Sequence, residues 1–247
     1  MQLYVIRHAQ SENNARWAQS RSDNGRSPDP LLTDVGVRQA RRLAQFLAQG
    51  DGAGDGERDP FNHQGFGLTH LYCSLMQRAV HTADILAEGL NLQPRGWAEI
   101  HERGGIYEQD PQTGERVGLP GLDRAYFAAH FPRLMLPEGL GEVGWWGERP
   151  YEAREEAYLR AQGVLETLAA RHGGTQDRVA IVTHGGFFFA FMFALLGMEP
   201  PDTNPEALRF VWFRMSNASV TRIDFHEELA NVVYLNRLDH LPPDLIT

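Results

Sequence analysis

Residues 3–14 read LYVIRHAQSENN and combine an apolar run with a charged end. The β-prone residues 3–6 stop at Arg7-His8, and residues 179–182, VAIV, repeat the pattern shortly before His184. Short, continuous apolar runs are typical of strands that are buried on both faces, as in a parallel sheet. We therefore expect two buried strands, each followed by a histidine at its carboxyl end.

Helical patterns alternate with the strand-like runs. Residues 71–73 form a third run, and after it apolar residues recur at helical spacing from Ala79 to Leu90. Thr33 is a typical capping residue before a second apolar stripe that ends at Gly50, and a third stripe, from Ala157, stops at Gly173-Gly174. Strands that alternate with amphipathic helices predict an α/β fold. We expect a three-layer α/β/α sandwich around a mainly parallel sheet.

Two segments near the C-terminus extend this prediction. The longest apolar stretch, residues 185–198, is shorter than the roughly 20 residues of a membrane span and predicts a buried helix. Residues 221–225 alternate between apolar and polar, and residues 232–235 follow across a polar turn. This pair predicts a hairpin that adds an antiparallel edge strand to the sheet.

The chain is expected to form a single domain over residues 1–247, with two segments outside the repeating pattern. Residues 51–66, DGAGDGERDPFNHQGF, are rich in Gly and Asp and predict a solvated surface loop. Residues 104–150 are rich in Gly and Pro and stand between core elements. A long irregular segment in that position predicts a small cap insertion.

Composition and charge narrow the class of partner. With 23 Lys and Arg against 32 Asp and Glu, the formal net charge is −9, which disfavours nucleic acid and anionic membrane surfaces as general partners. Cys73 is the single cysteine, so no internal disulfide can form, and the opening MQLYVIRH lacks the features of a signal peptide. We expect a cytoplasmic protein that acts on a small molecule; its oligomeric state is left open.

The residues after the strand-like runs suit a phosphoryl group. In a parallel α/β sheet, ligands bind beyond the carboxyl ends of the strands, where Arg7-His8, Arg78 and His184 would converge. Arginine offers a planar fork of donors to phosphate oxygens, and a neutral imidazole can attack phosphorus. The HExxH, GxxxxGK[ST] and GxSxG motifs are absent. The sequence thus favours a phosphoryl-binding pocket over a nucleotide-dependent, zinc or serine-hydrolase site, and no metal or cofactor is expected.

Four motifs in the same order resemble those of the histidine phosphatase superfamily, also called the phosphoglycerate mutase-like family. Residues 3–14 resemble its RHG[ET][ST] opening and residues 32–40 its LTxxGxxQA segment. Residues 73–83 are similar to its SxLxRAxxTA helix start, and residues 182–186 to its second-histidine motif. Because residues 216–221 also resemble a late strand of the family, the likeness spans most of the chain outside the loop and the cap.

The resemblance implies roles for individual residues. His8 would be the nucleophile that becomes phosphorylated, and the phosphate pocket would consist of Arg7, Arg78, His184 and Gly185. Asn14 matches the family asparagine that hydrogen-bonds the phosphoryl oxygens. Residues 100–104, IHERG, resemble the segment that carries the proton donor, which makes Glu102 the expected acid, with Glu99 and Glu108 as rivals.

The sequence also departs from the family pattern. Ala9 replaces the usual glycine and Gln10 a more common Glu or Thr, changes that we expect to leave activity intact. The acidic stretch at residues 104–110 is unlike the basic segment of cofactor-dependent mutases, so the expected function is hydrolysis of a phosphate monoester. A phosphoglycerate mutase-type transfer is the alternative, followed by a non-catalytic member that binds phosphorylated ligands. The cap aromatics Tyr107, Trp145 and Trp146 are expected either to contact an organic leaving group or to be buried.

Overall fold

The computed structural model describes residues 1–22, 24–50, 59–198, 211–227 and 229–247. The strands are β1 (Gln2–Arg7), β2 (His70–Cys73), β3 (Pro94–Gly96), β4 (Tyr107–Gln109), β5 (Arg116–Gly118), β6 (Arg178–Thr183), β7 (Val220–Phe225) and β8 (Ala230–Arg237). The α-helices are α1 (Glu12–Ser20), α2 (Asp34–Leu47), α3 (Gln77–Leu90), α4 (Arg124–His130), α5 (Arg154–His172) and α6 (Gly185–Leu195). Short 3₁₀ helices are η1 (Ala98–Ile100) and η3 (Pro243–Leu245).

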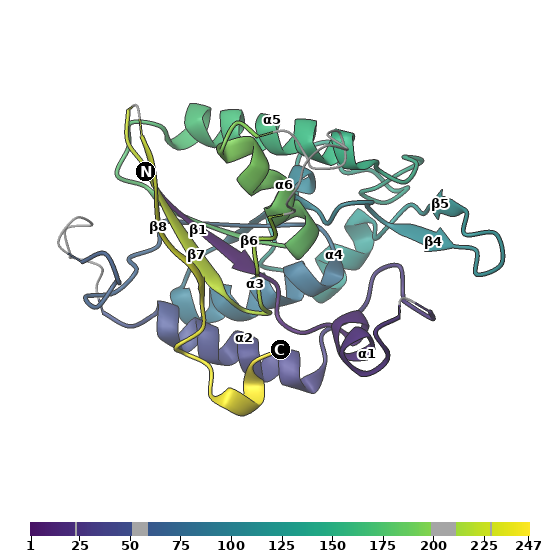
Figure 1. Ribbon diagram of the computed structural model, residues 1–247, viewed down its shortest axis with the longest axis horizontal. Helices are drawn as coiled ribbons and strands as arrows, with labels where there is room; N and C mark the ends of the chain where they lie inside the picture. The colour runs from purple at the N-terminus through teal and green to yellow at the C-terminus, as the bar shows by residue number, and fades with distance from the viewer. Residues whose placement is uncertain (23, 51–58, 199–210, 228) are drawn as a thin grey trace.

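A six-stranded sheet with the order β3-β2-β6-β1-β7-β8 forms the middle layer. β3, β2, β6 and β1 run parallel to one another, whereas β7 pairs antiparallel with both β1 and β8. Helices α2 and α3 cover one face of the sheet and α5 and α6 cover the other (Figure 1). The predicted three-layer α/β sandwich with an antiparallel edge is confirmed.

Both faces of β1 are buried, which explains its continuous apolar run. Tyr4 and Ile6 belong to the core on the α2–α3 side, and Leu3 and Val5 to the core on the α5–α6 side. All four side chains are fully buried, because successive residues of a strand point to opposite faces.

The parallel strands β1 and β6 end level with each other. The register pairs Arg7 with Thr183, the last residue of each strand. His8 and His184, the next residue along each chain segment, therefore leave the sheet at the same edge.

Two helix ends follow the sequence pattern and one does not. Thr33 caps α2 by accepting a hydrogen bond from the Gly36 amide, and Gly173 caps the end of α5, as expected. However, α2 ends at Leu47 and not at Gly50. Gly50 has a φ of +69° and forms a backbone bridge with Gly65. A Cβ on Gly50 would lie only 2.3 Å from the Gln64 carbonyl oxygen.

The sequence pattern did not indicate helix α1. The helix begins at a capping box in which Ser11 and Asn14 satisfy each other's backbone amides, and none of its residues is fully buried. Because helix prediction from periodicity depends on a buried apolar face, a short surface helix of this kind gives no such signal.

The expected solvated loop is described only from residue 59 onward, and residues 59–66 are partly solvated, with Phe61, His63 and Gln64 exposed. Residues 51–58 lie outside the described residues. Asp59, Asn62 and Phe66 are buried. Arg222 explains this packing: it is fully buried, pairs with Asp224 at 2.8 Å, and donates to the carbonyl oxygens of Asp59 and Pro60. A buried guanidinium requires such acceptors, so the chain folds against it.

Residues 104–150 contain the β4–β5 hairpin and α4. The hairpin lies at the same end of the molecule as α1 (Figure 1). Phe127, Trp145 and Trp146 of this segment are buried and join the core on the α2–α3 side. The two tryptophans therefore serve packing. Among the described helices none is long and apolar enough to cross a membrane.

Candidate active site

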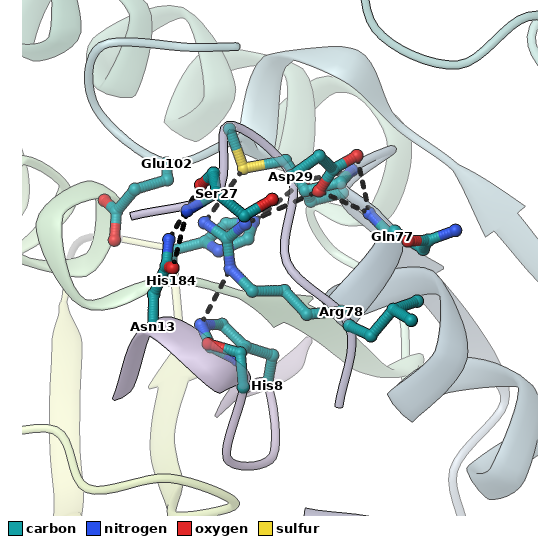
Figure 2. Close-up of polar contacts among 12 residues, drawn as sticks. His8, Asn13, Ser27, Asp29, Gln77, Arg78, Glu102 and His184 are labelled. Atoms are coloured by element: carbon teal, nitrogen blue, oxygen red, sulfur yellow. Dashed lines mark hydrogen bonds and ion pairs between the residues drawn. The ribbon is translucent and has the colours of Figure 1, made fainter. Parts of the chain in front are cut away.

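Two imidazoles meet at the carboxyl edge of the parallel strands. His8 follows β1, and His184 follows β6 and is the N-cap residue of α6. Their ring centroids are 5.0 Å apart, and both side chains are buried. Arg78, the second residue of α3, reaches the same point from the neighbouring strand–helix turn (Figure 2). The structure thus brings together residues that are up to 176 positions apart in the sequence, from His8 to His184.

Hydrogen bonds select one tautomer of His8. The Arg78 Nε–H group donates to His8 Nε2 at 3.2 Å, as Figure 2 shows, so Nε2 carries a lone pair. The proton is then on Nδ1, which lies 2.7 Å from the Ala9 carbonyl oxygen and donates to it. This arrangement fixes the ring and leaves the Nε2 lone pair directed at Arg78.

Burial keeps both imidazoles neutral. The pKa of His8 is held well below its usual value by burial, and then by the positive charges of Arg78 and Arg7. The pKa of His184 is lowered in the same way, by burial first and then by Arg78 and His8. A neutral imidazole is the form that can attack phosphorus.

Several donors around these rings have no hydrogen-bond partner among the described residues. They are Arg7 Nε, Arg78 Nη1 and His184 Nδ1, all of them buried. An unsatisfied buried donor costs roughly 1–3 kcal/mol. Together with the other nitrogens of the two guanidinium groups, these atoms form a set of donors of the kind that binds a tetrahedral oxyanion.

Arg7 remains a cation in this setting. Burial lowers the pKa of Arg7 to about 10, opposed by the negative charge of Glu102. One of its terminal nitrogens donates to the Met215 carbonyl oxygen, which holds the guanidinium in place. Gly185 lies beside it, since a Cβ there would stand 3.8 Å from Arg7 Nε.

Asp29 is a site residue that the sequence pattern did not single out. Its carboxylate lies 3.6 Å from Arg78 Nη1 and accepts hydrogen bonds from the Gln77 amide (Figure 2). Burial raises the pKa of Asp29 to about 6, although Arg78 opposes this. The residue precedes Pro30 in an irregular segment, where no periodicity marks it as functional.

Ser74 and Asn217 were also not among the expected site residues. Ser74 Oγ accepts the Met76 amide and forms a second hydrogen bond, of 2.9 Å, with His184 Nε2. When the hydroxyl donates to Nε2, the His184 proton is on Nδ1, the ring nitrogen that has no hydrogen-bond partner among the described residues. Asn217 donates from Nδ2 to both the His8 carbonyl oxygen and Asn14 Oδ1, at 3.0 Å each.

Asn14 has a structural role besides the one expected of it. Its Oδ1 atom accepts from the Ser11 amide, the Ser11 hydroxyl and Asn217. These bonds commit the oxygen to the cap of α1, so only the Nδ2 amide group is suited to bind a phosphoryl oxygen. That role stays a prediction.

Glu102 is a second carboxylate that the fold places next to this site. Its Oε1 atom accepts from the Phe187 amide at 3.0 Å and from the Arg103 amide at 2.9 Å, so the first turn of α6 orients it. Its charge acts on both Arg7 and Arg78. The rivals Glu99 and Glu108 are exposed, and neither has this link to the site arginines.

The alanine at the family's glycine position is accommodated. Ala9 is fully buried, its amide donates to Thr82 Oγ1, and its φ is not positive, so the methyl group introduces no backbone strain. Gln10 accepts from the Thr33 hydroxyl at 2.7 Å and joins the start of α1 to the cap of α2.

The chain is similar to phosphatases and mutases along most of its length. It is 28% identical, over 96% of both chains, to a Hydrogenobacter thermophilus protein provisionally named phosphoserine phosphatase 2. It is 26% identical to a Cronobacter sakazakii protein provisionally named phosphoglycerate mutase GpmB, over 92% of this chain and 86% of that protein. A crystal structure of a phosphoserine phosphatase mutant from Entamoeba histolytica, in complex with phosphoserine, superimposes with a TM-score of 0.58 at 19% identity. The superposition covers 98% of this chain and 99% of that one and establishes a shared fold.

The family model for branch 1 of the histidine phosphatase superfamily matches residues 3–55 and 61–238. These ranges include both histidines, both arginines and Glu102. The chain therefore belongs to the histidine phosphatase superfamily, branch 1.

Proposed function

We propose that this protein is a phosphatase that hydrolyses a phosphate monoester through a covalent phosphohistidine on His8. The observation that carries the proposal is the neutral His8 imidazole, whose Nε2 lone pair is oriented by Arg78 and which lies among buried donors that have no hydrogen-bond partner within the described residues. A phosphoryl group supplies the acceptors that these donors lack. The donors need no metal ion to hold it, and the proposed reaction uses none.

In the first step, His8 Nε2 forms a bond to phosphorus while the bond from phosphorus to the ester oxygen breaks. Arg7, Arg78 and the His184 Nδ1–H group would bind the three equatorial oxygens, where charge redistributes in the transition state. Gly185 and the Asn14 amide group line the same phosphate pocket. Glu102, in its protonated form, gives its proton to the departing alcohol oxygen.

In the second step, a water oxygen attacks the phosphoryl group and the bond from phosphorus to Nε2 breaks. Glu102, now a carboxylate, takes a proton from that water, so inorganic phosphate leaves and the acid is restored. A mutase differs only in that a substrate hydroxyl replaces the water. Members of the family bear both phosphatase and mutase names, and the acidic residues Glu108 and Asp110 stand in the stretch where cofactor-dependent mutases are basic, which favours the phosphatase.

The substrate we propose is a small phosphorylated molecule in the cytoplasm. The Entamoeba relative was crystallised with phosphoserine, a small monoester that sets a precedent for the ligand class. The net charge of −9 makes a nucleic acid an unfavourable substrate.

The experiment is hydrolysis of para-nitrophenyl phosphate in the presence of a chelator, from pH 5 to 8, with wild-type protein and His8→Ala. We expect turnover in the wild type and a loss of at least about 1000-fold in the variant, since no other group replaces the nucleophile. His63→Ala is the matched control, because His63 is exposed. Turnover that survives in His8→Ala would overturn the proposal.

A rapid-quench measurement tests the intermediate directly. With radiolabelled substrate, the wild type should retain an alkali-stable, acid-labile phosphoryl label, as a phosphorus–nitrogen bond requires, and His8→Ala should retain none. Label transfer to an added alcohol substrate in place of water would favour the mutase.

A further inference from the structure

Two histidines and an aspartate meet at the amino edge of the parallel strands. His70 is the first residue of β2, Asp177 immediately precedes β6, and His172 is the last residue of α5. The candidate active site lies beyond the carboxyl ends of the same two strands, which are followed by Ser74 and His184. The cluster is therefore at the opposite edge of the sheet and takes no part in the proposed reaction.

The three side chains converge on one point. One ring nitrogen of each histidine and one carboxylate oxygen of Asp177 all lie within 4.8 Å of one another. Asp177 Oδ2 lies 2.8 Å from His172 Nδ1, and Asp177 Oδ1 lies 4.0 Å from His70 Nδ1. The ligands of a tetrahedral Zn²⁺ ion, each about 2.0–2.2 Å from the metal, are roughly 3.4 Å apart. Because the two observed distances lie on either side of that value, small side-chain adjustments bring three ligands around one ion.

The donor atoms indicate which ion fits. Imidazole nitrogen suits Zn²⁺ and related transition metals, whereas Mg²⁺ and Ca²⁺ take oxygen ligands. Two imidazoles and a carboxylate are a known set for zinc sites in which water is the fourth ligand. The side chains of His70 and Asp177 are each 28% exposed, and His172 is buried. The cluster thus combines one fixed ligand with two that can adjust, and its exposed side lets an ion enter.

Tyr72 supports His172 in the way that metal-binding histidines require. Its hydroxyl oxygen lies 3.1 Å from His172 Nε2, while His172 Nδ1 donates to Asp177. A hydroxyl group can donate or accept, so it can bind Nε2 in either tautomer of the ring. When the ion replaces the proton on Nδ1, that proton moves to Nε2 and is donated to the Tyr72 oxygen. Such a partner on the second ring nitrogen fixes the orientation of a metal ligand.

His70 has a hydrogen-bond partner that it can release. Thr69 Oγ1 lies 2.8 Å from His70 Nδ1 and also 3.2 Å from the Arg178 carbonyl oxygen. The hydroxyl proton therefore has a second acceptor in the backbone. With that proton on the Arg178 carbonyl oxygen, the Nδ1 lone pair of His70 is available to a metal ion.

We propose that His70, His172 and Asp177 form a binding site for Zn²⁺, with water as the fourth ligand. The ion joins the end of α5 to the starts of β2 and β6 and so stabilises the folded chain. The reaction proposed for His8 still needs no metal, because the two sites lie at opposite edges of the sheet. The sequence pattern did not indicate the site, since His70 and His172 are 102 positions apart.

The test is a calorimetric titration of the full chain with Zn²⁺ after treatment with a chelator and its removal. We expect binding of one ion at the cluster, and Asp177→Asn and His70→Gln should each weaken it by about 10-fold or more. Both residues are partly exposed, so these variants are expected to fold. Tyr72→Phe keeps all three ligands and should weaken binding by roughly 10-fold. His63→Gln, which removes an exposed histidine outside the cluster, is the matched control and should bind as the wild type does.

Thermal unfolding gives a second readout. At free Zn²⁺ of about 100 times its Kd, the Tm of the wild type and of His63→Gln should rise by roughly 5–10 °C, and that of Asp177→Asn far less. Ca²⁺ and Mg²⁺ should raise none of them. The proposal fails if the wild type binds no Zn²⁺, or if both ligand variants bind it as tightly as the wild type. Zn²⁺ binding that is lost in His8→Ala but kept in Asp177→Asn and His70→Gln would likewise refute it, since the ion would then lie in the active site.

Discussion

The Nε–H group of Arg78 donates to Nε2 of His8 across 3.2 Å, so an arginine of the proposed phosphate clamp also holds the proposed nucleophile in the tautomer with a lone pair on Nε2. Arg78 is itself held by Asp29 on its other side. A ligand that takes over the Arg78 donors would release the Nε2 lone pair as it brings phosphorus to it. Ligand binding and activation of the nucleophile are thereby coupled through one side chain.

Replacement of Arg78 by lysine should lower kcat/KM for para-nitrophenyl phosphate by roughly 100-fold or more, the typical cost of a lost transition-state donor. Lysine keeps the charge but cannot donate from Nε and Nη positions together. Steady-state kinetics measure the effect. Arg133→Lys, at an exposed pair with Asp84, is the control and should behave as the wild type. Equal activity of the two variants would contradict a clamp at Arg78.

The loss of turnover in Glu102→Gln should depend on the leaving group of the substrate. An alkyl phosphate needs a proton on its alcohol, so its turnover should fall by roughly 100- to 10,000-fold, whereas para-nitrophenolate leaves without one and should lose far less. The parallel variants Glu99→Gln and Glu108→Gln should leave both rates unchanged, since their carboxylates are exposed and lack the link to the site arginines. Equal losses on both substrates in Glu102→Gln would argue against a proton donor at this position.

Gly186→Ala should displace the Glu102 carboxylate. The added Cβ would meet Oε1 at 2.3 Å, and Arg103 Cβ lies only 3.3 Å away. We expect turnover of alkyl phosphates to fall by about 10-fold or more, with a smaller effect on para-nitrophenyl phosphate, because a misplaced acid impairs proton transfer first. Gly163→Ala in α5, where a Cβ meets nothing within 4 Å, is the control. If the two alanine variants have the same kinetics, Gly186 does not position the acid.

The protein should lose stability as the pH falls from 7 to 5. Burial is the main cause that lowers the pKa of six histidines, which are His8, His70, His81, His101, His184 and, with a pKa of about 4, His240. Below a pH of about 6.5 the unfolded chain binds protons that the folded chain does not. Each such histidine therefore reduces the free energy of unfolding by up to about 1.4 kcal/mol per pH unit.

Asp29 acts in the opposite direction but is a single group. Its pKa is raised to about 6, so the folded state binds its proton first, and its contribution to stability declines as the pH rises from about 4 to 6. Urea unfolding at pH 7, 6 and 5 measures the sum, which we expect to follow the histidines. His240→Gln should reduce the slope of the free energy of unfolding against pH by the equivalent of about one bound proton. His63→Gln, at an exposed position, should leave that slope unchanged. An identical slope in His240→Gln and wild type would refute this account of His240.

The sequence was most informative where burial imposes periodicity. The runs that became β1, β2 and β6 and the stripes of α2, α3 and α5 are buried on the faces that the pattern indicated. Periodicity did not predict the surface features. Helix α1 has no buried face, and the chain after α2 forms a backbone bridge between Gly50 and Gly65. The packing of residues 59–66 depends on Arg222, which lies 163 positions beyond Asp59 in the chain.

The sequence by itself determined the chemical groups and their attachment to strand ends: His8 after β1, His184 after β6, and Arg78 at the start of α3. Local patterns suffice for this because each histidine directly follows its own apolar strand. Only the tertiary structure decided which atoms meet. Contacts between distant segments decide the level ends of β1 and β6 and the tautomer of His8. They also decide the supporting contacts of Asp29, Ser74 and Asn217. Such contacts arise from packing in three dimensions, which leaves no periodic trace in the chain.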